Sequence, residues 1–190
     1  MDLLKDERDD LVRMRILDIT DRLMLETSLD RLSVTEICKA AGLSRQTFYA
    51  HFRDKYAIAQ WYWELLGQRF LRETGRTLDW FEGNYYMLQA FSKRATFFAN
   101  SLKSNDFNGI KKYGNRRRRE YLAETVVDYL GLTLTPSLAY QIDFFVDAES
   151  RAVTTWMKRG MPQSLEELCR FLADCVPPQL YSLLDIRNNA

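Results

Sequence analysis

Two helix starts and one helix end lie close together between Ser33 and Ser44 in this chain. Ser33 stands three residues before Glu36, the spacing of a capping box, in which each side chain satisfies a free backbone amide of the other residue. Gly42 follows, and glycine readily takes the left-handed conformation that ends a helix. Ser44 can cap another helix only two residues later. The spacing therefore predicts a helix, a tight turn and a second short helix.

The remainder of the chain has helical spacing of apolar residues and no sustained strand alternation. A first helix is marked by an apolar face formed by Val12, Ile16, Ile19 and Leu23. Four more amphipathic stretches predict helices: YAIAQWYWELLGQRFL, YYMLQAFSKRATFFANSLKS, RRRREYLAETVVDYLG and SLEELCRFLADCV. The last opens with a second capping box, Ser164 to Glu167, and a long helix is expected from Pro136, after the cap Thr135, to Gly160. We therefore predict an all-α fold.

Aromatic residues are distributed unevenly along the chain. Residues 1–47 contain no Phe, Tyr or Trp, so all 11 Phe, 10 Tyr and 4 Trp fall in residues 48–190. The first part is therefore expected to be a small aliphatic module, and the rest a larger helical body with an aromatic interior. No Pro-, Gly- or Ser-rich linker separates them. We predict a three-helix helix-turn-helix domain over residues 1–54 and a C-terminal helical bundle over residues 55–190, joined by a continuous helix.

The composition excludes several classes of protein. Cys38, Cys169 and Cys175 have the spacing of neither a zinc site nor a disulfide framework, so we expect reduced thiols in a cytoplasmic protein. Neither a signal peptide nor a membrane span is apparent. A single histidine, His51, and the lack of a Gly-rich phosphate loop leave no set of catalytic residues that we can assemble. We expect no enzyme activity, no metal and no cofactor.

The second short helix carries side chains suited to double-stranded DNA, because a helix-turn-helix unit places its second helix in the major groove. Ser44 at its start leaves free amides and a positive dipole end that attract a phosphate. Arg45 and Gln46 can reach base edges, arginine with guanine and glutamine with adenine. Thr47 can donate a hydrogen bond or offer a methyl group to thymine. With the net charge at +1, any contact with nucleic acid must be local.

The other residues of this helix divide between its two faces. Phe48 and Phe52, four residues apart, are expected to face inward and hold the helix against its neighbours. Tyr49 and His51 are expected to point outward, with donors suited to backbone phosphates. Lys55, at the start of the next helix, adds a positive charge at the edge of the groove.

The segment LSVTEICKAAGLSRQTFYAHFRDKYAI, residues 32–58, resembles the DNA-binding segment of the TetR family of transcriptional regulators. The preceding helix, RILDITDRLMLETSLDRL, also fits, although Ser28 stands where the family usually has glycine. The resemblance implies sequence-specific binding to a DNA operator. It places phosphates at Ser33, Tyr49 and Lys55, bases at Arg45, Gln46 and Thr47, and the DNA backbone or groove at His51.

The same resemblance implies a homodimer formed through the last two long helices, and a small-molecule effector bound in the C-terminal body. FSKRATFFANSLKSND and TTWMKRGMPQSLEELCRFL are similar to a C-terminal subtype found near regulators of dihydroxyacetone kinase operons. Candidates for the effector pocket are Trp63, Phe98, Phe145 and Glu149, although an aromatic stripe on a helix is more often core. Glu149 shares its helix face with apolar residues, so its carboxylate is expected to be buried and to need a partner. Arg151 is too near in sequence, which leaves a pocket residue or a dimer salt bridge.

The run KKYGNRRRRE holds six positive charges between Lys111 and Arg119. It allows a second nucleic-acid patch or a targeting signal, but we favour a loop and first helical turn in solvent. Two rival functions remain for the whole chain. One is a helical protein-interaction module whose helix-turn-helix is non-functional, and the other is a helical enzyme, for which a convergent acid–base set is not found.

Overall fold

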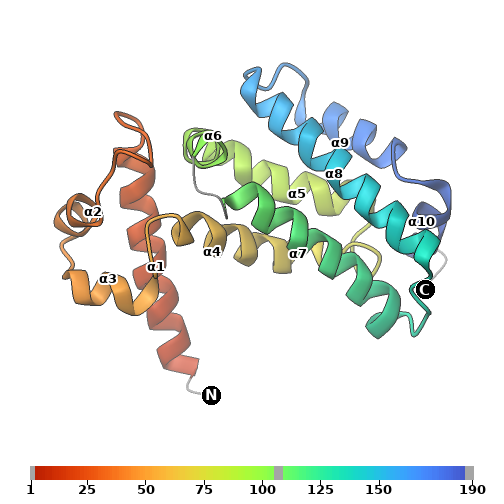
Figure 1. Cartoon of the computed structure of the whole chain (residues 1–190), viewed down its shortest axis with the longest axis horizontal. Helices are drawn as coiled ribbons and strands as arrows, with labels where there is room; N and C mark the ends of the chain where they lie inside the picture. The colour runs from red at the N-terminus through yellow and green to blue at the C-terminus, as the bar shows by residue number, and fades with distance from the viewer. Residues whose placement is uncertain (1–2, 105–108, 187–190) are drawn as a thin grey trace. The chain divides into compact units, whose positions relative to one another are not determined.

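The computed structural model describes residues 3–104 and 109–186, and within these ranges helices are joined by turns and loops, with one isolated bridge between Thr74 and Leu78 and no strand (Figure 1). The helices are α1 (Leu3–Leu23), α2 (Val34–Ala41), α3 (Arg45–His51), α4 (Ala57–Leu66), α5 (Trp80–Lys93), α6 (Ala95–Lys103), α7 (Ile110–Glu124), α8 (Pro136–Lys158), α9 (Leu165–Asp174) and α10 (Pro178–Leu183). Two π-helical turns, η1 (Gly67–Leu71) and η2 (Thr125–Tyr129), continue α4 and α7. The prediction of an all-α fold is confirmed. No helix in the described ranges is both long and apolar enough to cross a membrane.

The predicted helix–turn–helix boundaries are confirmed. Ser33 and Glu36 form the capping box, with the Glu36 amide donating to Ser33 Oγ at 3.2 Å and the Ser33 amide donating to Glu36 Oε2 at 2.8 Å. Gly42 ends α2 at φ 63°, in the left-handed region that glycine enters at no steric cost. Ser44 caps α3 by accepting a hydrogen bond from the Thr47 amide at 2.9 Å. Local capping chemistry therefore sets both helices and the turn between them.

The C-terminal helix boundaries were predicted in part. Thr135 caps α8 with Pro136 in its first turn, and the Ser164–Glu167 capping box opens α9. The sequence pattern missed α10, because a proline pair after α9 indicates a stop. Pro178 instead occupies the first turn of α10, where a missing amide hydrogen costs nothing.

The described chain divides into two compact units. The first unit comprises Met1–Trp63 and Arg94–Ile110, and the second unit comprises Glu64–Lys93 and Lys111–Ala190. Packing therefore groups α6 and the start of α4 with the N-terminal helices. The predicted functional division into residues 1–54 and 55–190 stays a prediction, because these units are defined by contacts alone.

In the first unit, α1 packs against α2 and α3, and α2 against α3. The buried face of α1 runs through Ile16, Leu17 and Thr20, and of the predicted apolar face only Ile16 is fully buried. The apolar pattern did not identify this face of α1, because one of its buried positions is a threonine. Its hydroxyl donates to the Ile16 carbonyl at 2.7 Å, which lets the side chain enter the core at little cost. Phe48 is completely buried on α3, as the sequence predicts.

The predicted single helix over residues 85–104 is wrong, because the chain breaks into α5 and α6 at Arg94, which has φ −127° and ψ 42°. The guanidinium of Arg94 donates to Asp18 and Asp21 of α1, the latter at 2.8 Å. Its guanidinium carbon also lies 5.4 Å from the centre of the Tyr62 ring. These contacts favour the break, because the two charge-assisted hydrogen bonds from Arg94 offset the free energy lost when that residue leaves the helical conformation.

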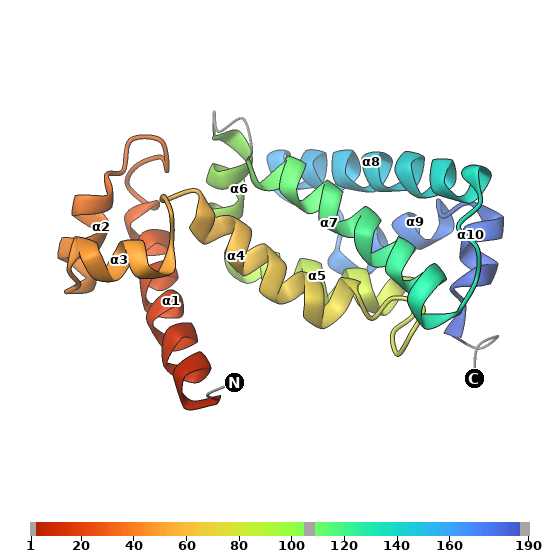
Figure 2. The same cartoon turned by 60° about the horizontal axis from the view of Figure 1, so that its bottom comes forward.

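The second unit is built around one aromatic and aliphatic cluster, in which Trp80 of α5 meets Phe145 of α8 at 5.3 Å between ring centres. α5 packs on α9, and α8 packs on α10. Arg118 and Arg119 of α7 pair with carboxylates of α8; the two helices run side by side in Figure 1 and diverge toward the end of α7 in Figure 2. The buried members of the cluster are Trp80, Leu122, Val126, Leu138, Ile142, Phe145, Val146, Val176, Leu180 and Leu184.

Candidate functional site

The exposed face of α3 presents Arg45, Gln46 and Tyr49 to solvent, while Phe48 anchors the opposite face. The guanidinium carbon of Arg45 lies 5.9 Å from the centre of the Tyr49 ring, one helical turn further along. Cation–π contacts of this kind hold an arginine near the ring at exposed sites. α3 is therefore a short, well-anchored helix whose outer face carries an arginine supported by a tyrosine.

The hydroxyl groups at the start of α3 contact each other. Ser44 Oγ and Thr47 Oγ1 are 2.8 Å apart, and Ser44 Oγ also accepts from the Thr47 amide. The Thr47 hydroxyl thus has an internal partner, and its methyl group is the remaining contact. At α2, the Ser33 hydroxyl similarly donates to Glu36 Oε2 at 2.6 Å. Hydrogen bonds from the Ser33 side chain and backbone lower the pKa of Glu36.

The prediction that His51 points outward is wrong, and its contact with DNA stays a prediction. Only 10% of its side chain is exposed, and its Nδ1 lies 4.0 Å from Asp9 Oδ1 on α1. Position 51 follows Phe48 by three residues, so it shares the helix face that packs inward. His51 is therefore placed against α1 and does not point outward from α3.

Lys55 also has a role that sequence reasoning missed. Its Nζ donates to the carbonyl oxygens of Asp30 and Leu32, both at 2.7 Å. These carbonyls belong to the loop that leads into the α2 cap. The Asp30 carboxylate in turn accepts from Tyr56 Oη at 3.1 Å and Ser104 Oγ at 3.0 Å. Lys55 thus ties the loop before α2 to the start of α4, and its contact with a phosphate stays a prediction.

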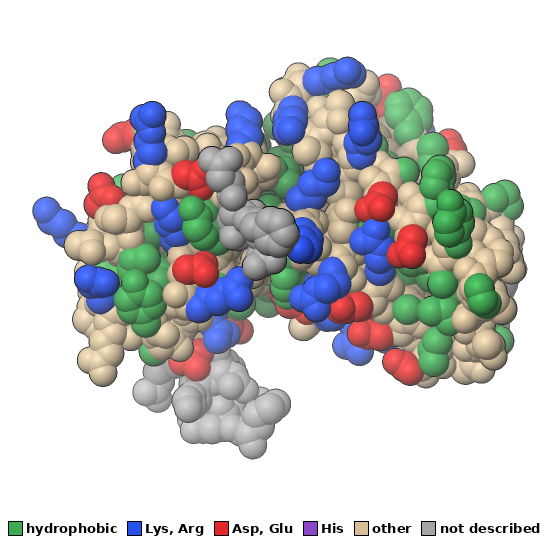
Figure 3. Space-filling model, in the orientation of Figure 1, with side chains coloured by type: hydrophobic (Ala, Val, Ile, Leu, Met, Phe, Trp, Pro, Cys, Tyr) green, Lys and Arg blue, Asp and Glu red, His purple; other side chains and the backbone are tan. Residues whose placement is uncertain are grey.

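Charge is balanced around this face. By count, residues 1–60 contain 10 Lys and Arg against 11 Asp and Glu. Basic and acidic side chains are interspersed on the face of the molecule seen in Figure 3. Attraction to a polyanion therefore depends on where single cations lie rather than on a broad positive field.

The effector candidates separate into two groups. Phe145 and Glu149 lie in the second unit, and Trp63 and Phe98 lie in the first, where both are buried. The first unit does have a surface hollow of about 510 Å³, but none of the four candidates lines it. That hollow is lined by Met24, Leu25, Glu26, Thr27, Ser28, Arg31 and Asn100.

The expected buried carboxylate is confirmed, and its partner is Arg118 of α7. Glu149 is 8% and Arg118 2% exposed, with Arg118 Nε 3.2 Å from Glu149 Oε2. Arg118 also donates to the Leu71 carbonyl at 2.9 Å and to Thr74 Oγ1 at 3.2 Å. Its guanidinium carbon lies 5.6 Å from the centre of the Trp80 ring. Glu149 thus makes an ion pair within the second unit, on the same cluster as Phe145.

The prediction that the arginine run forms a solvent-exposed loop and first helical turn is wrong. Residues 116–119 lie inside α7, and each arginine pairs with a carboxylate. Arg117 contacts Glu64 and Glu120, and Arg119 contacts two aspartates of α8. Four consecutive arginines point to four sides of a helix, so each meets a different neighbour. The clustering in sequence therefore gives no cluster of charge in space.

An apolar stripe lies exposed on α8 and α9. Tyr140 is 73% and Phe144 66% exposed, and the exposed residues Ala148 and Ala152 continue the same face of α8 at intervals of four. Phe171 of α9 is 55% exposed. Large aromatic side chains left in water as a group are typical of a surface that another chain covers.

Two family models match the chain. Residues 16–60 match the model described as bacterial regulatory proteins, tetR family, and residues 79–177 match the one described as transcriptional regulator C-terminal region. The HTH-type transcriptional regulator AlkX of Mycobacterium tuberculosis (strain ATCC 25618 / H37Rv) is 34% identical over 93 residues, 48% of this chain and 43% of the relative. The HTH-type regulator AcrR of Shigella flexneri is 42% identical over 53 residues, 28% and 25% of the two chains. The chain thus spans less than half the length of these curated relatives.

Solved structures show the same fold. The dihydroxyacetone kinase operon activator DhaS superimposes with a TM-score of 0.64 at 16% identity, over 89% of this chain and 96% of DhaS. A TetR transcriptional regulator from Streptococcus agalactiae 2603V gives 0.56 at 19% identity, over 96% and 99%. The TetR family repressor AlkX from Dietzia sp. strain DQ12-45-1b, implicated in biodegradation of n-alkanes, gives 0.53 at 18% identity, over 91% and 97%.

Proposed function

The chain belongs to the TetR family of transcriptional regulators, and from this premise we propose that it is a homodimeric, sequence-specific DNA-binding protein whose operator affinity is set by a small molecule. Members of the family are DNA-binding regulators rather than enzymes. One observation carries the proposal for this chain. The outer face of α3 presents Arg45 and Gln46 at the first turn of a helix fixed by the Ser44 cap and the buried Phe48.

Each α3 residue has a distinct proposed role at the operator. Arg45 takes a guanine edge, and Gln46 takes an adenine edge. Tyr49 holds the Arg45 side chain by its ring and donates its hydroxyl to a phosphate. Thr47 offers a methyl group, since its hydroxyl already contacts Ser44. The free amides at the start of α3 add a phosphate contact beside Ser44.

Three further residues act around this face. Ser33 at the start of α2 lies at a second site for a phosphate. Lys55 primarily holds the loop before α2. Two N–H donors of its ammonium group bind carbonyl oxygens, so only the third can bind a phosphate. His51 supports the helix from α1 and contributes to the groove only indirectly.

Dimerisation is proposed through the stripe on α8 and α9. Large apolar areas are exposed to water at Tyr140, Phe144 and Phe171. A two-fold axis allows this surface of one copy to pack against the same surface of a second copy. Two copies also supply two recognition helices, which symmetric operators require at about 34–36 Å spacing. The effector is proposed to bind in the second unit, at the aromatic cluster around Phe145 and Glu149.

The test is selection of duplexes from a random library by the full-length protein, followed by fluorescence anisotropy on the selected sequence. We expect a palindromic consensus and a preference of at least about 10³-fold over unrelated duplex. Arg45→Ala should reduce that preference by about 5- to 150-fold, the equivalent of about 1–3 kcal/mol, whereas Lys39→Met, which removes one exposed charge from α2, should keep it. Failure to enrich any sequence, combined with a folded protein, would favour the protein-interaction module instead.

A further inference from the structure

The chain passes from the first unit to the second inside a helix. Residues of α4 up to Trp63 belong to the first unit, and α4 from Glu64, together with η1, belongs to the second. Whatever holds Glu64 and the end of η1 therefore holds the part of the α4–η1 segment that belongs to the second unit. Two adjacent arginines of α7 hold these two points.

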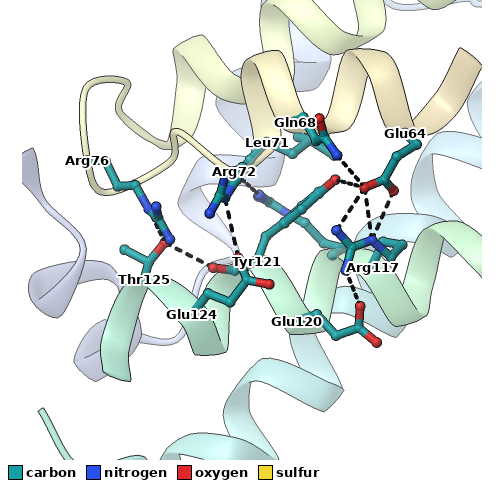
Figure 4. Close-up of polar contacts among 11 residues, drawn as sticks. Glu64, Gln68, Leu71, Arg72, Arg76, Arg117, Glu120, Tyr121, Glu124 and Thr125 are labelled. Atoms are coloured by element: carbon teal, nitrogen blue, oxygen red, sulfur yellow. Dashed lines mark hydrogen bonds and ion pairs between the residues drawn. The ribbon is translucent and has the colours of Figure 1, made fainter. Parts of the chain in front are cut away.

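The first point is Glu64, whose carboxylate is surrounded by donors (Figure 4). Arg117 donates to it from Nη2 at 2.8 Å and from Nε at 2.9 Å. Tyr113 and Tyr121 each donate a hydroxyl at 2.9 Å, and Gln68 donates its amide at 2.9 Å. Burial alone would raise the pKa of Glu64, but hydrogen bonds from Arg117, Gln68 and the two tyrosines lower it to about 2. Three of these donors lie at intervals of four on one face of α7.

The second point is the end of η1. The last carbonyl groups of a helix lack intrahelical partners, and Arg118 donates to that of Leu71 at 2.9 Å. Arg118 also donates to Thr74, which is completely buried against Gly83 of α5. A Cβ on that glycine would come within 2.5 Å of Thr74 Oγ1. The chain after η1 therefore has little room to move unless Arg118 moves with it.

α7 is in turn tied to α8. Arg118 pairs with Glu149 in the core, and Arg119 donates to Asp143 at 2.6 Å and contacts Asp147 at 2.8 Å at the surface. A buried charge left without its partner is costly, so a displacement of Glu149 must be followed by Arg118. The contacts form one chain from α8 through α7 to both ends of the α4–η1 junction.

We propose that Arg117 and Arg118 are positioning residues that grip the α4–η1 junction at two points and transmit changes at α8 to α4. The inference rests on the proposed function, in which binding in the second unit controls DNA binding by the first. The π-helical turn η1 lies between the two grips, and such single turns are rare and recur at functional sites. A relative shift of the two grips therefore strains η1 and changes how firmly the end of α4 at Glu64 is held.

Two glutamates give a matched pair of variants. Glu64 and Glu120 both bind Arg117, but Glu120 lies on α7 itself. Glu120→Ala removes a carboxylate from Arg117 and leaves α4 attached, whereas Glu64→Ala detaches α4. Acetate supplied at high concentration can replace the lost carboxylate of Glu64→Ala, but it has no covalent bond to α4. Acetate should therefore restore thermal stability to Glu64→Ala without restoring the position of α4.

The experiment measures amide hydrogen exchange of residues 57–66 and anisotropy on the duplex that the wild-type protein selects from a random library. Glu64→Ala should exchange at least about 10-fold faster in α4 and bind the duplex with altered affinity, with and without acetate. Glu120→Ala should match the wild type in both measurements. Full recovery of exchange and affinity with acetate would show that Glu64 only neutralises Arg117, and equal effects of the two variants would also overturn the grip.

A double-mutant cycle tests transmission from α8. Glu149→Gln weakens the second grip, and Glu64→Ala removes the first. If both act through the α4–η1 junction, their effects on duplex affinity should depart from additivity by about 2-fold or more. Strict additivity would refute transmission. Failure to select any duplex would remove the proposed function, while the exchange measurement on α4 would still decide whether Arg117 fixes that helix.

Discussion

Lys55 provides the sharpest test of how the DNA-binding unit is held together. Its ammonium group bonds to the carbonyls of Asp30 and Leu32, directly before the Ser33 cap. Lys55→Met keeps the aliphatic stem and removes both hydrogen bonds. A hydrogen bond to a charged group contributes about 1.5–3 kcal/mol when buried, and water replaces part of that at a half-buried site. We expect a total loss of about 1–3 kcal/mol.

The loss should appear in two measurements. Thermal unfolding should shift downward by about 2–10 °C for a chain of this size. Amides of residues 29–34 should exchange faster, because the loop before α2 loses its attachment. Lys39→Met, which removes an exposed charge from the same unit, should leave both unchanged.

DNA binding then separates the two roles of Lys55. If it acts through the loop, affinity falls for all sequences in proportion to the lost order of α2 and α3. A Lys55→Met variant with wild-type unfolding and exchange, yet weaker binding and a salt slope reduced by about one unit, would refute the structural role. Lys55 would then be a phosphate contact alone.

Three further predictions follow. Arg45→Ala should cost about 1–3 kcal/mol on the selected duplex and relax base preference at one position per half-site, measured by competition with single-base variants. Phe144→Asp should convert the dimer to a monomer in light scattering at micromolar concentration, while Val127→Asp, at another exposed apolar site, should not. Glu64→Gln should remove an acid-sensitive part of stability. Because the folded pKa is depressed to about 2, this contribution of up to about 2 kcal/mol is present above pH 4.5 and is lost as pH falls toward 2. Urea midpoints of wild type and variant should therefore converge between pH 5 and pH 2.5.

Features fixed by neighbouring residues could be predicted from the sequence. The capping boxes at Ser33 and Ser164, the cap at Ser44 and the left-handed Gly42 each depend on a few adjacent positions. The inward orientation of Phe48 likewise follows from the spacing of nearby residues on α3. Such interactions repeat wherever their residues appear at the right spacing, so they require no knowledge of the tertiary fold.

For features that depend on residues distant in sequence, the need for a partner could be predicted but its identity could not. The need of Glu149 for a partner follows from its apolar helix face, but nothing local identifies Arg118. The arginine run shows why: Arg117 and Arg118 are adjacent in sequence and bind carboxylates on different helices. The break at Arg94 has the same origin, since its two aspartates lie on α1.

The balanced charge of the N-terminal segment has a consequence for how the proposed operator binding is achieved. The N-terminal segment has no excess of positive charge to attract DNA. Non-specific DNA binding by one copy should therefore be weak, and its affinity should depend little on salt concentration. Base contacts from Arg45 and Gln46 add discrimination, but a single half-site contains few of them. A second copy joined through the α8–α9 stripe makes the second half-site an intramolecular contact, which raises overall affinity by a large factor without any new cation. In this protein, unlike one with a basic arm, specific binding should therefore fall together with dimerisation. Phe144→Asp is the variant that decides this, because Phe144 lies on α8 and belongs to no part of the proposed DNA contact.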